Sequence, residues 1–214
     1  MVAVDATPPE PVVFGPDESV PSRPFTSVAE TQRDRSVLDE LLTDVRRLLD
    51  DAAGETQITP YETVQWWVEG RVRRHVVCDE ARLRSDPGLC VVGFFGERRT
   101  SVDATPLEEA NTALIASFAE YPGITAYSST ERPDGNWGNL VLHDDPVDAE
   151  YWRQSALHAE AVRMLSPLHY RTVRIHNALL TAPVPSAPAI TLVSTKYYDF
   201  TADPEWRGLR EHRR

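Results

Sequence analysis

Residues 124–146 read ITAYSSTERPDGNWGNLVLHDDP, and this stretch decides the fold that the sequence predicts. Two largely apolar runs, 124–130 and 136–143, flank Pro133-Asp134-Gly135. Short runs on either side of an Asp-Gly pair are typical of a β-hairpin. Asp145-Pro146 follows at once, and a capping acid before a proline marks the start of a helix. The stretch therefore predicts strand, turn, strand and helix.

Three more strands are predicted around this stretch, and a further helix start at Thr105-Pro106 lies before it. From residue 89 the predicted order is strand, helix, strand, strand, helix, strand, strand. This order is the ferredoxin-like βαββαβ motif of the α+β class, in which an antiparallel sheet carries both helices on one face. The additional strands are CVVGFFGE (90–97), YRTVRIHNALL (170–180) and ITLVSTKYYDF (190–200).

The segments outside this motif predict an extension. Six prolines among acids and hydroxyls before residue 25 indicate a flexible arm, which could instead wrap a partner subunit. Val and Leu recur at helical spacing behind Ser36, and Thr59-Pro60 predicts another helix into the low 70s. Residues 71–84 fit either helix or strand. We expect a flexible arm at 1–35, a helical extension at 36–84, the ferredoxin-like domain at 85–200 and a tail at 201–214.

Composition narrows the partners and the compartment. The 214 residues are 41% apolar, which indicates a globular chain, and carry a formal net charge of −11. An excess of acid disfavours nucleic acid and anionic membranes. The chain has no apolar run of about eighteen residues and no basic leader, so we expect a cytoplasmic protein with no membrane span. Cys78 and Cys90 form no CxxC or Cys/His cluster, so no metal site is expected.

His158 is the strongest site candidate, because it lies on the predicted inner side of the helix after Asp145. Projection at about 100° per residue places Ser155 and His158 within an apolar arc that should face the sheet. A histidine in such a place either packs in the core with its nitrogens satisfied or handles a ligand or a proton. Both roles stay open. The arc consists of Tyr151, Trp152, Ala156, Ala159, Val162 and Leu165.

Alternation along 170–180 separates two faces of the sheet. Val173 and Ile175 should meet the helices, whereas Arg174 and His176 should form a polar cluster on the other face, away from His158. Ser194, Lys196 and Tyr198 repeat the semi-polar pattern on the next strand, and we expect them on that second face. A face of this kind suits packing against a second sheet. The sequence therefore predicts a homodimer in which two such faces meet.

The stretch YPGITAYSSTERPDGNWGNLVLHDDPVDAEYWRQSALHAEAV (121–162) resembles the antibiotic biosynthesis monooxygenase-like family of the dimeric α/β-barrel superfamily. The likeness covers about residues 89–182 and rests on the order of elements and on a helix with Trp, Ser and His. Some members oxidise phenols without a cofactor, and others bind or degrade haem through a histidine. The resemblance implies that His158 and Asn139 are catalytic. It also implies a pocket with Trp137, Trp152, Tyr127, Phe94 and Ser155 as substrate-binding residues.

Three functions follow as alternatives. The first is an oxygenase-like enzyme for an aromatic or polyketide-like molecule, with His158 as base or hydrogen-bond donor. The second is a non-enzymatic dimer that binds a small molecule or haem. The third is a structural or partner-binding protein. The sequence leaves enzymatic activity open, and the cofactor is either absent or haem. Nucleotide transfer and triad hydrolysis are disfavoured, because no phosphate loop or nucleophile elbow is present.

Overall fold

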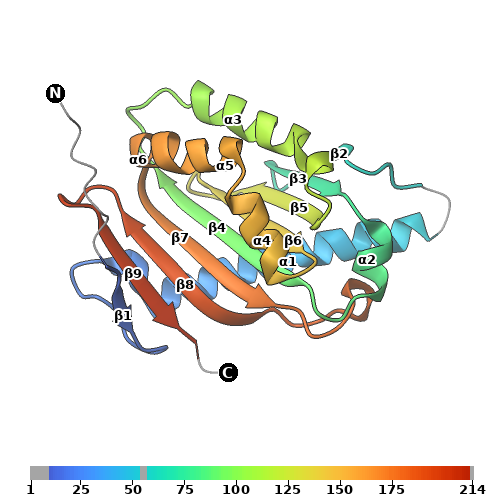
Figure 1. The fold of residues 1–214 in the computed structure, drawn as a ribbon, viewed down its shortest axis with the longest axis horizontal. Helices are drawn as coiled ribbons and strands as arrows, with labels where there is room; N and C mark the ends of the chain where they lie inside the picture. Colours follow the sequence, from blue (N-terminus) through green and yellow to red (C-terminus); the bar gives the residue numbers. More distant parts are fainter. Residues whose placement is uncertain (1–9, 54–56, 213–214) are drawn as a thin grey trace.

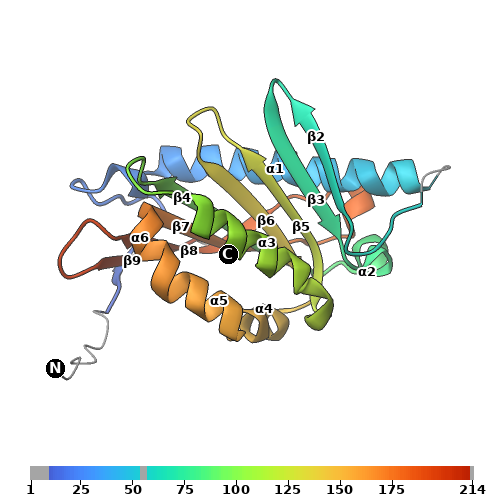
Figure 2. The same ribbon diagram turned by 90° about the horizontal axis from the view of Figure 1, so that it is seen from above.

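A computed structural model describes residues 10–53 and 57–212. One nine-stranded sheet carries helices on both faces (Figures 1 and 2), in the strand order β1-β9-β8-β7-β4-β6-β5-β3-β2. We call the side of α1 the back face and the side of α3–α6 the front face. The strands are β1 (Val12–Phe14), β2 (Thr63–Val68), β3 (Arg71–Val77), β4 (Cys90–Arg98), β5 (Ile124–Glu131), β6 (Trp137–His143), β7 (Tyr170–Leu179), β8 (Thr191–Asp199) and β9 (Trp206–Glu211).

The helices differ widely in length. The longest is α1, and the front-face helices are short and interrupted. A π-helical segment, Ala161–Leu165, joins α5 to α6, and single 3-10 turns occupy Pro24–Thr26, Phe118–Glu120 and Val184–Ser186. The α-helices are α1 (Val28–Ala52), α2 (Glu80–Ser85), α3 (Thr105–Ala116), α4 (Pro146–Arg153), α5 (Ala156–Glu160) and α6 (Ser166–His169).

The centre of the sheet confirms the predicted ferredoxin-like arrangement. Strands β4, β5, β6 and β7 are antiparallel neighbours in the order β7-β4-β6-β5, and α3 and α4–α6 are the two crossovers. All five strands predicted between residues 90 and 200 are present within one or two residues. The sheet is larger than the simple motif, because β8, β9 and β1 extend one side and β3 and β2 the other.

Residues 60–77 form a β-hairpin, so the predicted helix there is wrong. Thr59-Pro60 does not start a helix, because Tyr61 takes a positive φ of 65° and the chain turns into β2. The reversal between β2 and β3 uses Glu69 and Gly70, both at positive φ. Trp66 stacks on His75 across the pair at 4.1 Å between ring centroids. Aromatic and β-branched residues on both sides of this turn favour strands.

Helix α1 begins nine residues earlier than an N-cap at Ser36 predicts. Its N-cap is Ser27, whose hydroxyl accepts a hydrogen bond from the Glu30 amide at 3.2 Å. The Ser36 hydroxyl instead donates to the Gln32 carbonyl inside the helix. A serine within a helix can satisfy its hydroxyl this way, so its presence alone does not mark a start.

The predicted arm and the predicted tail each contain a strand, and these two strands pair with each other. Strand β1 lies parallel to β9, so residues 12–14 and 208–210 form one edge of the sheet. Arg210 is buried and donates to the Thr31 hydroxyl at 2.7 Å, to the Glu18 carbonyl at 2.6 Å and to the Thr26 carbonyl. A buried guanidinium needs several acceptors, and the predicted arm supplies all three of these. The expectation of flexibility is therefore wrong for residues 10–35, while residues 1–9 lie outside the described ones.

The main hydrophobic core lies between α1 and the back face. Leucines and valines at helical spacing on α1 pack against side chains from the sheet, including Phe95 and Leu140, both fully buried. Each fully buried aliphatic side chain stabilises the fold by about 1.5–3 kcal/mol. The α1 members of the cluster are Leu38, Leu41, Leu42, Val45 and Leu49.

A buried ionic cluster joins α1 to the same face. The Asp34 carboxylate accepts two hydrogen bonds from Arg174, at 2.5 and 2.8 Å, and lies 2.9 Å from His176 Nε2. His176 Nδ1 lies 2.9 Å from the Thr195 hydroxyl. Burial alone would raise the pKa of Asp34, but the hydrogen bonds from Arg174 and His176 outweigh it and lower that pKa. Asp34 is therefore a carboxylate at neutral pH.

These contacts correct the expected dimer face. Arg174 and His176 do lie opposite the front helices, as predicted, but α1 of the same chain covers them. Ser194, Lys196 and Tyr198 were expected beside them and instead pair with Asn177, Ile175 and Val173 on the front face. Thr195 and Tyr197 take their place, because the register of β8 against β7 sets which residues share a face. Two copies cannot join their back faces while α1 is in place.

We expect Asp34→Ala to destabilise the fold by about 3–5 kcal/mol, because Arg174 and His176 would stay buried without their anion. Asp39→Ala, on the exposed side of α1, is the matched control and should change stability by about 0.5 kcal/mol or less. Urea unfolding at pH 7 measures both. Because the pKa of Asp34 is lower in the folded chain, its contribution should be complete above about pH 4 and fall in stronger acid. Equal effects of the two variants would contradict this account.

Candidate functional site

The front layer is packed far less tightly than the back one. Helices α3 and α5 and the π-helical segment contain no buried residue, whereas eight residues of α1 are buried. Several sheet side chains beneath these helices are only half-buried, among them Phe94, Asn139 and Ile175. Segments with few buried contacts separate from the fold most readily. The front layer is therefore the part of the fold that can open most readily.

The helix that was expected to run unbroken from Asp145 is divided. Asp145 caps α4 as predicted, through its carboxylate and the amides of Val147 and Asp148. The chain then leaves helical geometry at Ser155, whose hydroxyl accepts from the His158 amide at 3.2 Å and caps α5. The division breaks the predicted apolar arc, so that Tyr151 is 60% exposed. Trp152 and Ser155 remain buried.

His158 turns inward and meets Trp152, with ring centroids 5.4 Å apart. Its Nδ1 is buried and has no hydrogen-bond partner among the described residues. The π-helical segment begins three residues later, and single π turns occur frequently at functional sites. His158 therefore lies on the side of α5 that contacts Trp152, and its role as a site residue stays a prediction.

A second imidazole shares this place, and the sequence reasoning missed it. His143, the last residue of β6, is almost fully buried on the front face, and its Nδ1 also lacks a partner in the described part of the chain. It lies close enough for the charge of His158 to affect its ionisation. His75 and His169 each have one such nitrogen too, but they lie elsewhere in the fold. We call His143 and His158 the histidine pair.

Both imidazoles of the histidine pair are neutral at pH 7. Burial, with the charges of His158 and Arg153, lowers the pKa of His143 to about 4. Burial also lowers the pKa of His158, although a backbone hydrogen bond at Arg153 opposes the shift. A neutral imidazole has one nitrogen that donates and one that accepts. The pair can therefore bind a group with both capacities, such as a hydroxyl.

The other predicted site residues lie further along the same face. Asn139 precedes His143 by four positions on β6, a separation of about 13 Å along a strand. It pairs in register with Phe94, which pairs in turn with Ile175. Asn139 therefore belongs to the centre of the sheet, and no contact joins it to the histidine pair within the described residues. We call Asn139, Phe94, Ile175 and Lys196 the central row, because β8 continues it with Lys196.

Aromatic side chains surround the central row. Tyr170 meets Phe94 edge to face at 5.5 Å and lies so close to Gly96 that a β-carbon there would collide with its ring. A β-bulge between Glu97 and Arg98 shifts the register of β4 against β7, and Tyr170 consequently lies on the front face instead of beside Arg174. Tyr127, also predicted as a pocket wall, is buried, and its hydroxyl donates to Asn111 of α3 at 3.4 Å.

Two of the predicted residues have packing roles. Trp137 lies beneath the guanidinium of Arg74, 4.5 Å from the ring centroid, at the far end of β6 from His143. Trp152 forms a small second core with Phe118 and Tyr121, which meet it edge to face at 5.5 and 4.9 Å. Trp152 thus both anchors α4 and borders His158.

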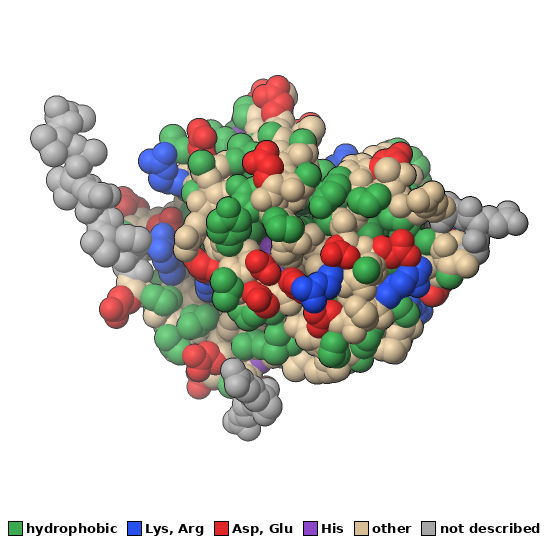
Figure 3. Space-filling model, turned by 45° about the vertical axis from the view of Figure 1, so that its right-hand side comes forward, with side chains coloured by type: hydrophobic (Ala, Val, Ile, Leu, Met, Phe, Trp, Pro, Cys, Tyr) green, Lys and Arg blue, Asp and Glu red, His purple; other side chains and the backbone are tan. Residues whose placement is uncertain are grey.

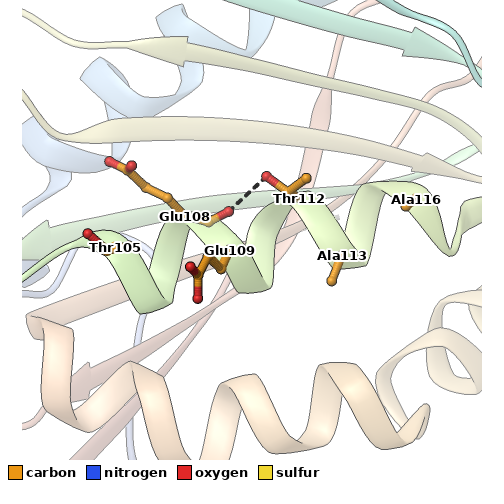
Figure 4. A pocket seen from close by; sticks show the side chains of 6 residues that line it. All are labelled: Thr105, Glu108, Glu109, Thr112, Ala113 and Ala116. Atoms are coloured by element: carbon orange, nitrogen blue, oxygen red, sulfur yellow. Dashed lines mark hydrogen bonds between the residues drawn. The ribbon is translucent and has the colours of Figure 1, made fainter.

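Two hollows of the surface lie away from the histidine pair. The larger, about 420 Å³, is lined by α3 alone, and Figure 4 shows Glu109 and Ala113 directed toward the facing helix. The smaller, about 110 Å³, lies beside α1 and Val184. Figure 3 shows apolar side chains exposed among acidic ones on the surface. Among the described residues no His, Cys, Asp or Glu cluster could hold a metal ion, both cysteines are free thiols, and no helix is long and apolar enough to cross a membrane.

We expect the imidazole C–H signals of His143 to stay constant between pH 8 and 5 and to move only near pH 4 in nuclear magnetic resonance spectra. Because the folded pKa is below the ordinary 6.5, the unfolded chain takes up the proton first, and stability should fall as pH drops from about 6.5 toward 4. His143→Gln assigns the signal and should flatten this part of the stability curve. A midpoint near 6.5 would show an open, solvated ring.

Comparison with known proteins identifies no family. No family model matches the chain, and no curated protein matches it. A crystal structure of a protein from Shewanella oneidensis is similar over 45% of this chain and 94% of its own, at 10% identity and a TM-score of 0.40. A dimeric ferredoxin-like protein of unknown function from Thermobifida fusca is similar over 46% of this chain and 96% of its own, at 14% identity and a TM-score of 0.39. Membership of the antibiotic biosynthesis monooxygenase-like family therefore stays a prediction.

Proposed function

We propose that this chain binds a small aromatic molecule with a hydroxyl group between the front face of the sheet and the helices α3–α5. The observation that carries the proposal is the histidine pair: each imidazole has a buried Nδ1 with no partner among the described residues, and the charge of His158 reaches His143. Buried polar atoms are nearly always hydrogen-bonded in folded proteins, so a paired exception favours an absent partner. A phenol supplies one donor and one acceptor to such a pair.

The loose front layer supports the same proposal. A ligand has to pass between the sheet and the helices, and α3 and α5 contribute no buried residue that such a passage would expose. Trp152 and the aromatic rings around the central row provide the apolar walls that small-molecule sites require. Neither of the two hollows adjoins His158, so the proposal requires that the site opens when α3 and α5 move away from the sheet.

The chemistry proposed at this site is proton removal. His158 is neutral at pH 7 and can accept the proton of a phenol that its neighbour His143 orients. In the family that the sequence resembles, a phenolate formed in this way reacts with oxygen. We extend the proposal to an oxygenase-like enzyme of the cytoplasm on that resemblance. Asn139, about 13 Å along β6 from His143, contacts the far end of a large substrate and not the reacting hydroxyl.

Haem is not part of the proposal. The resemblance would make His158 the axial ligand, but its ring packs against Trp152 at 5.4 Å and lies beside a second imidazole. These residues do not fit a planar macrocycle, and no step depends on one.

We expect 2-naphthol to bind the purified protein and naphthalene to bind less tightly, because only the first can use the histidine pair. His158→Ala should weaken 2-naphthol binding about tenfold, the value of one lost hydrogen bond to a buried group. Isothermal titration calorimetry gives the affinities. Amide hydrogen exchange should slow in α3 and α5 when the ligand binds, and oxygen uptake with 2-naphthol would separate an oxygenase from a binding protein.

His169→Ala is the matched control, since His169 is also buried with an unpartnered Nε2 but lies at the end of α6. It should leave the affinity unchanged. A His158→Ala protein that melts much lower yet binds 2-naphthol as tightly would assign His158 to packing. Failure of the wild-type protein to prefer 2-naphthol over naphthalene would reject the site.

A further inference from the structure

Strand β2 is an exposed edge of the sheet that lacks the usual protection against pairing. The strand order places it at the end of the sheet, with β3 as its neighbour. Its residues, Thr63–Val68, include no charged residue and no proline, although proteins commonly use both to keep an edge from pairing. Val64 is 41% exposed and Trp67 is 64% exposed. In Figure 2 the β2–β3 hairpin extends past α1, so another chain can reach this edge.

The opposite edge of the sheet has the protection that β2 lacks. Strand β1 is three residues long and lies between Pro11 and Pro16. A short strand bounded by prolines offers few groups to a further strand, because proline has no N–H to donate. The contrast indicates β2 as the edge that can accept another strand.

The turn between β2 and β3 decides which backbone groups of β2 point outward. Glu69 and Gly70 both have positive φ, of 51° and 76°, and Val68 pairs with Arg71. A two-residue turn of this kind closes on a hydrogen-bonded pair, and such pairs alternate along an antiparallel ladder. Every second residue of β2, counted back from Val68, therefore bonds to β3, and the residues between them direct their N–H and C=O groups outward. The outward residues are Thr63, Gln65 and Trp67.

We propose that β2 pairs with β2 of a second copy of this chain, antiparallel and centred on Gln65, so that one continuous sheet crosses two chains. The outward residues are symmetric about Gln65. In this register Gln65 meets its own counterpart, and Thr63 of each copy meets Trp67 of the other. Every outward N–H and C=O then has a partner, whereas a register centred on another residue leaves some of them unpaired. This contact is separate from the histidine pair and goes beyond the proposed function.

The side chains that this register brings together suit one another. Val64 comes opposite Trp66 of the second copy, and an aromatic residue against a β-branched one is a favourable cross-strand pair. Trp66 already stacks on His75 of its own chain, with ring centroids 4.1 Å apart. Its ring is therefore held in place before the second copy arrives, which lowers the entropy cost of association.

The local charge favours self-association at this edge. The chain has a formal net charge of −11, so two copies repel each other over most of their surface. The hairpin segment 59–77 differs, because its three arginines outnumber its two acids. Pairing at β2 thus joins two copies through a segment whose charges nearly cancel. The charged residues of this segment are Glu62, Glu69, Arg71, Arg73 and Arg74.

Sedimentation velocity measures the association, with Gln65→Pro as the test and Gln65→Ala as the matched control. Proline removes the outward N–H at the centre of the pairing, and an edge strand tolerates it because that N–H does not bond to β3. We expect the wild-type protein and Gln65→Ala to be dimers. Gln65→Pro should raise the dissociation constant of the dimer at least about a hundredfold, since each copy loses one hydrogen bond worth about tenfold. The melting temperature shows whether the proline variant is folded.

Trp67→Lys is the second variant, in case Gln65→Pro does not fold. Its site is 64% exposed, so the substitution leaves the core intact and places a charge on the edge. This variant should also be a monomer. A wild-type protein that is monomeric at about 100 μM would overturn the proposal. A dimer that survives Trp67→Lys would overturn it too, because another surface would then hold the copies together.

A spin label tests the register. The Cα atoms of opposite hydrogen-bonded residues lie about 5.5 Å apart, so a nitroxide on Gln65→Cys should show strong dipolar broadening from its counterpart. The native thiols of Cys78 and Cys90 are buried and should stay unlabelled. Val13→Cys, at an exposed position of β1 on the opposite edge, is the control and should show no broadening. A dimer without broadening at residue 65 would reject the pairing.

Discussion

The charged carboxylate of Asp34 is buried in the interface between α1 and the sheet, where it is hydrogen-bonded to Arg174 and His176. The leucines of α1 supply most of the contact area, but an apolar stripe can shift along a sheet at small cost. A buried carboxylate cannot shift, because moving it by one residue would leave three polar groups without partners. The ionic cluster thus sets where α1 lies, and α1 sets which face of the sheet is closed.

Because α1 covers the back face, the two faces of the sheet differ in how closely their side chains pack and in how many polar groups are paired. The back is dense, and its polar groups are largely paired, as in the Arg73–Asp44 and Arg174–Asp34 contacts at 2.6 and 2.5 Å. The front holds half-buried side chains under short helices, and it carries the histidine pair. In this fold most of the stabilising contacts lie on the back face, and the side chains that could bind or react lie on the front face. Proteins generally separate a rigid scaffold from the site that it supports in this way.

The sequence predicted the strands from 90 to 199 because each alternates or runs apolar between turn residues. It failed at Thr59-Pro60, where the local cap pattern was outweighed by tertiary pairing of a Trp-rich hairpin. Asp34 gave no signal, because it fell within the predicted flexible arm and its partners lie 140 and 142 residues further along the chain. Its partners did carry a signal, because Arg-x-His occurs three times on strands or at a strand end, each time facing the back. The three pairs are Arg73 and His75, Arg174 and His176, and Arg210 and His212.

The face of the sheet on which His143 lies could have been predicted from the sequence. Alternation along β6 places it on the face of Asn139, and it ends the strand that leads into the helix of His158. Its proximity to His158, however, depends on the division of the helix at Ser155, which no spacing rule foretells. Side-chain parity can be read from a sequence, whereas a helix break made by one serine is decided by packing.

The contacts of α1 also impose an order on assembly. Thr31 meets Tyr197 and Arg210 across 166 and 179 residues, and Asp34 meets its partners across 140 and 142. A ribosome releases α1 long before β7, β8 and β9 exist, so Thr31 and Asp34 must wait for these partners. Pairings this distant in the chain slow folding and leave apolar surface open to other chains meanwhile. The acid within that stripe keeps the waiting helix hydrated at one point, and the arrival of the last strands is what allows it to dock.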